Sequence, residues 1–167
     1  MAFREISVEE LKDNPFTLIN KDWMLITAGN REKHNTMTAS WGGVGELWGR
    51  YVSTIYIRPQ RYTLEFVERE DYYSLCFFGP EYRQALNLCG SKSGREVDKD
   101  AATGLTPCFD EAAPYYEQAR LVFLCRKLYR QDLEEGCFLD KGLLEKWYDN
   151  DLHRKFIGEI VKVLEKE

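Results

Sequence analysis

Short segments rich in β-branched and aromatic residues recur along this chain, and they constrain its fold more than any other feature. They predict strands at residues 23–28, 51–57 and 72–78 and within 115–129, and extended chain at residues 36–41. Only short helices fit between them, at residues 7–14, 59–70, 80–90 and 140–148. Because strands and helices do not alternate regularly, the pattern favours an antiparallel barrel with added helices over a doubly wound sheet.

Several boundaries follow from local signals. Ser7 and Glu10 form a capping box for the first helix, and the glycines from Gly42 to Gly49 predict a loop. Residues 91–104 are polar and are expected to form an ordered functional loop. The helix at 140–148 is expected to bury Leu143, Leu144 and Trp147. The last apolar segment, 156–164, fits a helix and partly a strand, and periodicity does not decide between them.

Length and composition predict a single domain spanning residues 1–167. A net charge of -5 argues against nucleic acid as the main partner. The 5 cysteines are odd in number and lack a CxxC pair, and no signal peptide or membrane-spanning run is visible. We therefore expect reduced thiols in a cytoplasmic protein. With only 2 histidines and this cysteine spacing, no metal site is expected.

Common catalytic motifs do not fit the sequence. The glycines of residues 42–49 miss the dinucleotide fingerprint by one position, and residues 90–93 lack the glycines of a phosphate-binding P-loop. No nucleophile elbow is present, and no cysteine stands out as a nucleophile.

One candidate ligand-binding segment runs from Asn35 to Gly43 and reads Asn-Thr-Met-Thr-Ala-Ser-Trp-Gly-Gly. Short hydrogen-bonding side chains around one indole suit a flat, polar, phosphate-bearing cofactor. A polar turn with one buried tryptophan is the plainer interpretation of the same residues.

Three further segments carry charge and hydroxyl groups. Residues 58–63 combine two arginines with a threonine at an expected helix start, where backbone amides favour anions. Residues 90–95, continued by Asp98 and Lys99, combine glycine, serine and basic residues that could form a phosphate nest. His153 precedes the last apolar segment and could hold a substrate or a nicotinamide. A solvated helix cap, a charged loop and a surface histidine are the corresponding structural interpretations. Taken together, the four segments fit a phosphorylated aromatic cofactor that performs the chemistry itself.

The order and spacing of these segments resemble the flavoredoxin-type flavin reductases, a family with an FMN-binding split β-barrel. The resemblance rests on residues 35–43, 58–63, 92–95 with 98–99, 104–107, 125–129, and His153 with 156–160. It implies a mainly β fold, an antiparallel FMN-binding split β-barrel with a few short flanking α-helices. It also implies a homodimer with FMN at the interface, and a strand at residues 156–163.

The resemblance assigns roles to particular residues. It implies that His153 is the catalytic position beside the flavin, and that Met37 to Trp41 line the isoalloxazine ring. It implies that the turn at 58–63 and the loop at 92–99 reach the ribityl or phosphate end. The cofactor-binding residues implied in this way are Asn35, Met37, Thr38, Ala39, Ser40, Trp41, Arg58, Arg61, Tyr62, Thr63, Phe78, Ser91, Lys92, Ser93, Gly94, Arg95 and Lys99.

The function expected from the resemblance is an FMN-dependent oxidoreductase. NAD(P)H would be the co-substrate and would deliver hydride to flavin N5, and a flavin or a protein would accept the electrons. The alternative is a non-catalytic FMN-binding protein that serves as an electron carrier or redox-responsive partner. A barrel without flavin, acting as an interaction module, is a third possibility, but it would not need the basic residues Lys92, Arg95 and Lys99.

Overall fold

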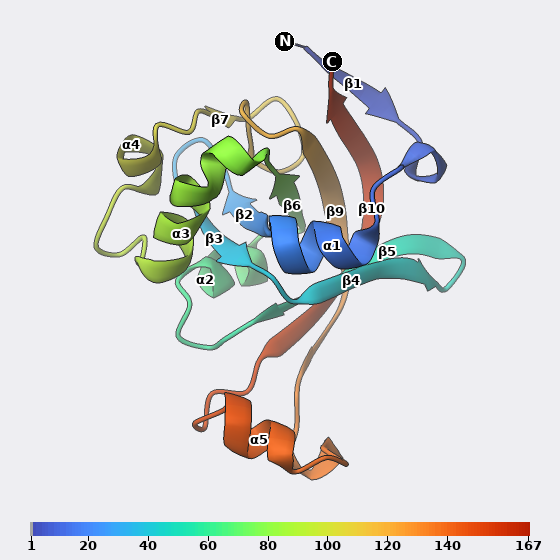
Figure 1. Cartoon of the computed structure of the whole chain (residues 1–167), viewed down its shortest axis with the longest axis vertical. Helices are drawn as coiled ribbons and strands as arrows, with labels where there is room; N and C mark the ends of the chain where they lie inside the picture. Colours follow the sequence, from blue (N-terminus) through green and yellow to red (C-terminus); the bar gives the residue numbers. More distant parts are fainter. Residues whose placement is uncertain (1) are drawn as a thin grey trace.

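The computed structural model describes residues 2–167, and one eight-stranded sheet dominates it (Figure 1). The main path of the sheet is β3-β2-β6-β9-β10-β5-β4, with β1 added to β10, and every pairing is antiparallel. The strands are β1 (Phe3–Ile6), β2 (Met24–Gly29), β3 (His34–Ala39), β4 (Gly42–Leu47), β5 (Arg50–Ile57), β6 (Tyr72–Phe77), β9 (Leu121–Asp132) and β10 (Arg154–Lys166). A separate two-stranded ribbon pairs β7 (Pro107–Cys108) with β8 (Tyr115–Tyr116).

Short helices flank the sheet. They are α1 (Pro15–Thr17), which continues into a π-helical turn at Leu18–Asp22, α2 (Thr63–Arg69), α3 (Arg83–Ser91), α4 (Lys99–Thr103) and α5 (Gly142–Trp147). Single 3-10 turns lie at Val8–Glu10, Pro80–Tyr82 and Glu135–Cys137. No helix within residues 2–167 combines the length and apolar character needed to cross a membrane.

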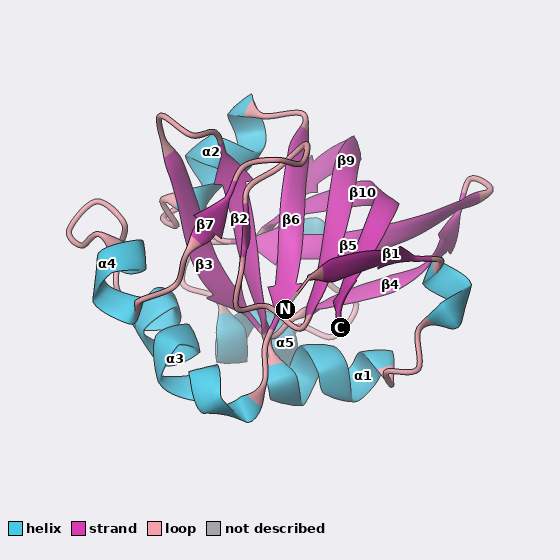
Figure 2. Ribbon diagram, turned by 90° about the horizontal axis from the view of Figure 1, so that it is seen from above, coloured by secondary structure: helices cyan, strands magenta, loops and turns pink. Residues whose placement is uncertain are grey.

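The sheet curls into a barrel that stays open between β3 and β4. These two strands are the ends of the hydrogen-bonded path, yet only Ser40 and Trp41 separate them in the chain. The opening therefore lies next to the Asn35 to Gly43 segment. Helices α1 and α2 lie on opposite sides of the barrel, while α3 and α4 run along its outside near β3 (Figure 2).

Two hydrophobic clusters hold these elements together. The first fills the barrel, and the second lies between the outer face of the sheet, α3 and residues 105–119. Strand β9 contributes side chains to both clusters, because Leu121 and Phe123 point into the barrel while Val122 and Leu124 point outward. Both faces of β9 are therefore buried, which explains its nearly continuous apolar sequence.

A protruding arm, residues 133–153, leaves the end of β9 and returns at the start of β10 (Figure 1). It carries α5, and the backbone N–H of Leu133 bonds to the carbonyl of His153 at its base, at 2.9 Å. The arm was expected to bury the apolar side of its helix. Instead Leu143 and Trp147 are 44% and 43% exposed, although the Trp147 ring contacts that of Trp41.

The strands expected at 23–28, 51–57 and 72–78 are confirmed within one residue, and the strand implied at 156–163 is confirmed within β10. The apolar segment 115–129 divides into β8 and β9. The capping box of Ser7 and Glu10 is present, but it closes one 3-10 turn instead of a helix to residue 14.

Two other expectations are wrong. Residues 42–47 form strand β4, because pairing with β5 overrides the poor strand propensity of glycine. The helix expected from Pro59 begins only at Thr63, because residues 58–62 first turn across the barrel opening. Pro15, the residue just after the helix expected at 7–14, begins helix α1. The polar loop at 91–104 also contains helix α4, capped by Asp98.

Candidate functional site

A cavity of about 180 Å³ lies at the barrel opening, and we call it the split cavity. Its walls come from the end of β3, the link to β4, the turn after β5 and the residue before β10. The lining residues are Met37, Thr38, Ala39, Ser40, Trp41, Tyr56, Arg58, Arg61 and His153. The structure thus brings together eight residues expected from the sequence (the nine lining residues without Tyr56). Tyr56 was missed, although it stands two residues before Arg58, on the same side of an extended chain.

His153 is buried in this cavity, with 7% of its surface exposed. Its Nδ1 shares a hydrogen bond with the hydroxyl of Tyr148 at 2.8 Å, and its ring lies 5.4 Å from that of Trp41. Burial, with a smaller contribution from the Arg58 cation, lowers the pKa of His153 to about 4. The imidazole is therefore neutral at physiological pH and suits packing and hydrogen bonding to an uncharged group.

Arg58 was expected to hold a phosphate, but its guanidinium is committed to the arm. It donates to the Asp151 carboxylate at 2.7 Å and to the Trp147 carbonyl at 2.9 Å, and it lies 4.9 Å from the centre of the Tyr148 ring. The pKa of Asp151 falls to about 2, because the carboxylate accepts hydrogen bonds from the Asp149 backbone, Gln60 and Arg58. The charge of Arg58 is thus balanced within the chain.

Arg61 and Lys99 meet at the C-terminal end of α3. Arg61 donates to the carbonyls of Gly90 at 2.9 Å and Cys89 at 3.4 Å. Lys99, which is 6% exposed, donates to the carbonyls of Thr36 at 2.6 Å and Cys89 at 2.9 Å. Both side chains therefore share the carbonyl of Cys89.

This pair of cations has no ionic partner among residues 2–167, because all of its acceptors are neutral carbonyls. Burial lowers the pKa of Arg61 and brings that of Lys99 to about 8, where the nearby Arg61 cation adds to the shift. The carbonyls at the C-terminal end of α3 carry partial negative charge and stabilise both cations, but they supply no formal counter-charge. The pair therefore forms the strongest candidate phosphate contact in the site.

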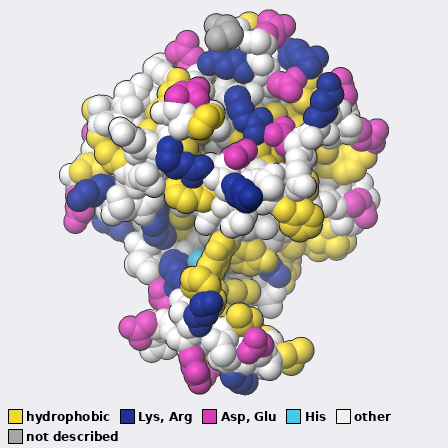
Figure 3. Space-filling view, viewed as in Figure 1, with side chains coloured by type: hydrophobic (Ala, Val, Ile, Leu, Met, Phe, Trp, Pro, Cys, Tyr) yellow, Lys and Arg dark blue, Asp and Glu magenta, His cyan; other side chains and the backbone are white. Residues whose placement is uncertain are grey.

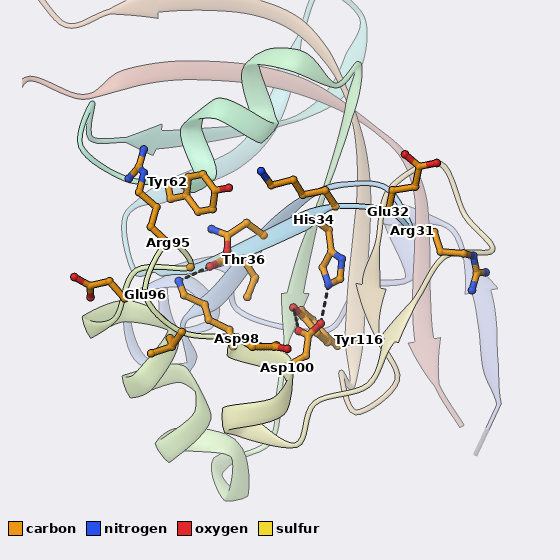
Figure 4. Close-up of a pocket in the computed structure, with 15 residues that line it drawn as sticks. Arg31, Glu32, His34, Thr36, Tyr62, Arg95, Glu96, Asp98, Asp100 and Tyr116 are labelled. Atoms are coloured by element: carbon orange, nitrogen blue, oxygen red, sulfur yellow. Dashed lines mark hydrogen bonds and ion pairs between the residues drawn. The ribbon is translucent and has the colours of Figure 1, made fainter.

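A second cavity, of about 450 Å³, is lined by Lys99 but not by Arg61 (Figure 4). It contains the expected residues Asn35, Tyr62, Gly94, Arg95 and Lys99, and it shares no lining residue with the split cavity. Arg95 pairs with Glu65 and lies over the Tyr62 ring, so its charge is also balanced.

The second cavity also holds a hydrogen-bonded chain that the sequence did not reveal. Asp100 binds Nε2 of His34 at 2.7 Å and accepts from the hydroxyl of Tyr116 at 2.8 Å (Figure 4). His34 lies 66 positions before Asp100 and Tyr116 lies 16 positions after it, so no local pattern joins the three residues.

The remaining expected residues lie outside both cavities. Thr63 is buried and accepts a hydrogen bond from Asn35 at 2.8 Å. Ser91 ends α3, and Lys92 and Ser93 follow it; none of the three lines either cavity, and Lys92 is exposed. Phe78 does not reach the split cavity, because it is buried in the outer hydrophobic cluster against Tyr82 and Tyr116. Residues 2–167 contain no group of three or more histidine, cysteine or acidic side chains that could hold a metal ion.

The depressed pKa of His153 makes a testable prediction. Between pH values of about 6.5 and about 4 the unfolded chain binds a proton that the folded chain does not. The free energy of unfolding should therefore fall as the pH is lowered through this range, and His153→Gln should flatten that dependence. NMR titration of the ring should give a midpoint of about 4. A midpoint at the ordinary value of about 6.5 would show that the ring is hydrated.

Comparisons with known proteins place this geometry in a family. A family model described as "Flavin reductase like domain" matches residues 17–167. No curated protein matches the chain significantly.

Solved structures share the fold at low sequence identity. Flavoredoxin of Desulfovibrio vulgaris is 21% identical, with 98% of this chain and 78% of that chain covered and a TM-score of 0.68. An FMN-binding protein from Thermus thermophilus with bound p-hydroxybenzaldehyde is 21% identical, covering 98% and 82%, with a TM-score of 0.69. An NADH:FAD oxidoreductase from Streptomyces globisporus, in complex with NAD and FAD fragments, is 14% identical, covering 87% and 74%, with a TM-score of 0.63. The chain therefore belongs to the flavin reductase-like family, and its barrel, open between β3 and β4, is the split barrel of that family.

Proposed function

We propose that this protein is an FMN-dependent oxidoreductase that takes hydride from NAD(P)H to flavin N5 and passes electrons to a flavin or protein acceptor. The observation that carries the proposal is the convergence of Met37 to Trp41, Arg61 and His153 on one cavity from three distant segments. Family membership supports the same conclusion.

The residues at the barrel opening fit FMN on two physical grounds. The end of β3 is an edge, so backbone groups from Met37 to Ser40 and the Ser40 hydroxyl are available to the polar rim of a flat ring. The Thr38 hydroxyl already donates to the Leu86 carbonyl. The cations of Arg61 and Lys99 lack a counter-charge, which a phosphate would supply. Bound FMN would supply the hydride acceptor and the two-electron chemistry.

The protein's own part is positioning. His153 stays neutral and is fixed through Tyr148, so it offers an uncharged imidazole beside the indole of Trp41. We propose that these two rings orient the nicotinamide. Neither needs to transfer a proton, because a hydride moves directly from donor to flavin.

The second candidate is a non-catalytic FMN-binding electron carrier that a partner protein reduces. The structural similarity to the flavoredoxins of Desulfovibrio vulgaris and Methanosarcina acetivorans supports keeping it. Both candidates need FMN and the same phosphate contact, and they differ only in whether NAD(P)H reduces the flavin.

We also propose that the protein is a homodimer with FMN at its interface. Large hydrophobic side chains are exposed near the split cavity and along β4 and β5, among them Trp41, Trp48 and Tyr51. Sedimentation of the FMN-loaded protein should give twice the monomer mass, and a fully loaded monomer would contradict the proposal.

Anaerobic absorbance spectroscopy tests the function directly. The FMN-loaded protein should lose its flavin bands rapidly on addition of NADH or NADPH, and the faster reaction names the donor. Bands that persist with both nucleotides would favour the electron carrier. A colourless protein that ignores added FMN would contradict both candidates.

In the reductase, His153→Ala should slow bleaching of the flavin bands more than it weakens FMN binding. The reverse result would remove His153 from the nicotinamide position.

The phosphate assignment makes a separate prediction. Arg61→Ala should weaken FMN binding by about 10- to 100-fold, because it removes a charge-assisted contact, and exposed Lys92→Ala should have a smaller effect. Riboflavin, which lacks the phosphate, should bind both variants as it binds the wild type. Lys12→Ala, an exposed charge far from these residues in the sequence, is the matched control. If the affinity for FMN is unchanged in both Arg61→Ala and Lys92→Ala, the phosphate lies elsewhere.

A further inference from the structure

Trp147 is the last residue of α5, and its ring contacts that of Trp41, which lines the split cavity. The two indole rings lie 5.0 Å apart between centres and cross at 88°. Both remain partly open to solvent, with 39% of Trp41 and 43% of Trp147 exposed. Figure 3 shows hydrophobic side chains gathered where the arm joins the barrel. We call this perpendicular pair the indole corner.

The arm is held in place at this corner by several contacts. The Arg58 guanidinium binds both the Trp147 carbonyl, at 2.9 Å, and the Asp151 carboxylate, at 2.7 Å. Tyr148, the next residue, is hydrogen-bonded to His153 and packs against Phe138 at 5.8 Å. These contacts fix the backbone at Trp147 and the residues that follow it, although the rest of α5 is largely exposed.

The shape and charge of the corner define what it can bind. Two rings at right angles offer one face and one edge, so a flat ring can stack on one indole and meet the edge of the other. One cation, the Lys146 ammonium, lies 4.9 Å from the centre of the Trp147 ring, whereas Arg58 is balanced by Asp151 and His153 is neutral. Covering exposed indole surface with another flat ring is favourable.

We propose that Trp147, together with Trp41, forms a stacking site for the flat heteroaromatic ring of the redox partner, either the nicotinamide of a donor or the isoalloxazine of a free flavin. Trp147 is then a positioning residue on a segment outside the motifs that identify the family. This inference rests on the proposed function, because the stacked ring must reach FMN bound in the split cavity.

Two replacements of Trp147 separate stacking from simple apolar packing. Trp147→Phe keeps a flat ring, while Trp147→Leu keeps apolar volume without one. Leu143→Ala is the matched control, because it removes an exposed apolar side chain from the same helix at 44% exposure. NAD+ and riboflavin serve as probes in separate titrations of the FMN-loaded protein, followed through the absorbance of the bound flavin. NAD+ cannot deliver a hydride, so this readout is independent of turnover.

Trp147→Leu should weaken binding of one probe by about three- to tenfold, as expected for loss of an aromatic pair. Trp147→Phe should stay close to the wild type, and FMN affinity should be unchanged in all three variants. If Trp147→Leu weakens the binding of NAD+ alone, the corner binds the donor. If it weakens the binding of riboflavin alone, the corner binds the acceptor.

Equal affinity of Trp147→Leu and Leu143→Ala for both probes would overturn the inference. So would a loss of FMN affinity in Trp147→Leu that matches the loss of probe affinity, because the ring would then support the cofactor site itself. Failure of the wild type to bind FMN would instead refute the proposed function, so the two failures are distinguishable.

Discussion

The carbonyl of Cys89 is the contact on which the candidate site depends. Lys99 from α4 and Arg61 from the turn before α2 both donate to it, and Lys99 also holds the Thr36 carbonyl of β3. One carbonyl at the end of α3 therefore ties together three segments that border the barrel opening. The same contact concentrates two positive charges without a carboxylate, so the bonds that build the opening also prepare it for an anion.

Arg58 fixes the arm to the barrel beside the split cavity. The Arg58 side chain lines the split cavity, yet its guanidinium binds two groups of the arm, the Asp151 carboxylate and the Trp147 carbonyl. Arg58, which the sequence suggests for ligand binding, thus also holds the arm in place. The cavity that remains has Arg61 as its one unbalanced cation among the described residues and a neutral imidazole at its wall.

Several strands could be predicted from the sequence, and so could eight of the nine residues that line the split cavity, for reasons that differ from residue to residue. Met37 to Trp41 and His153 lie in motifs that resemble a family, so they were found although Trp41 and His153 come from opposite ends of the chain. Strand β4 was missed because glycines predict loops, and only its pairing with β5 makes it a strand. The partners of Arg58 and Arg95 could not be predicted, because ion pairs with Asp151 and Glu65 depend on tertiary packing. The same holds for Trp147, whose exposure contradicts the apolar stripe that its helical spacing predicts.

A crystal structure of the protein grown with FMN would test the central claim most directly. The account predicts that the isoalloxazine ring lies against Met37 to Trp41 in the split cavity, with its phosphate beside Arg61 at the end of α3. A ring bound at another surface, or a phosphate far from both Arg61 and Lys99, would contradict it.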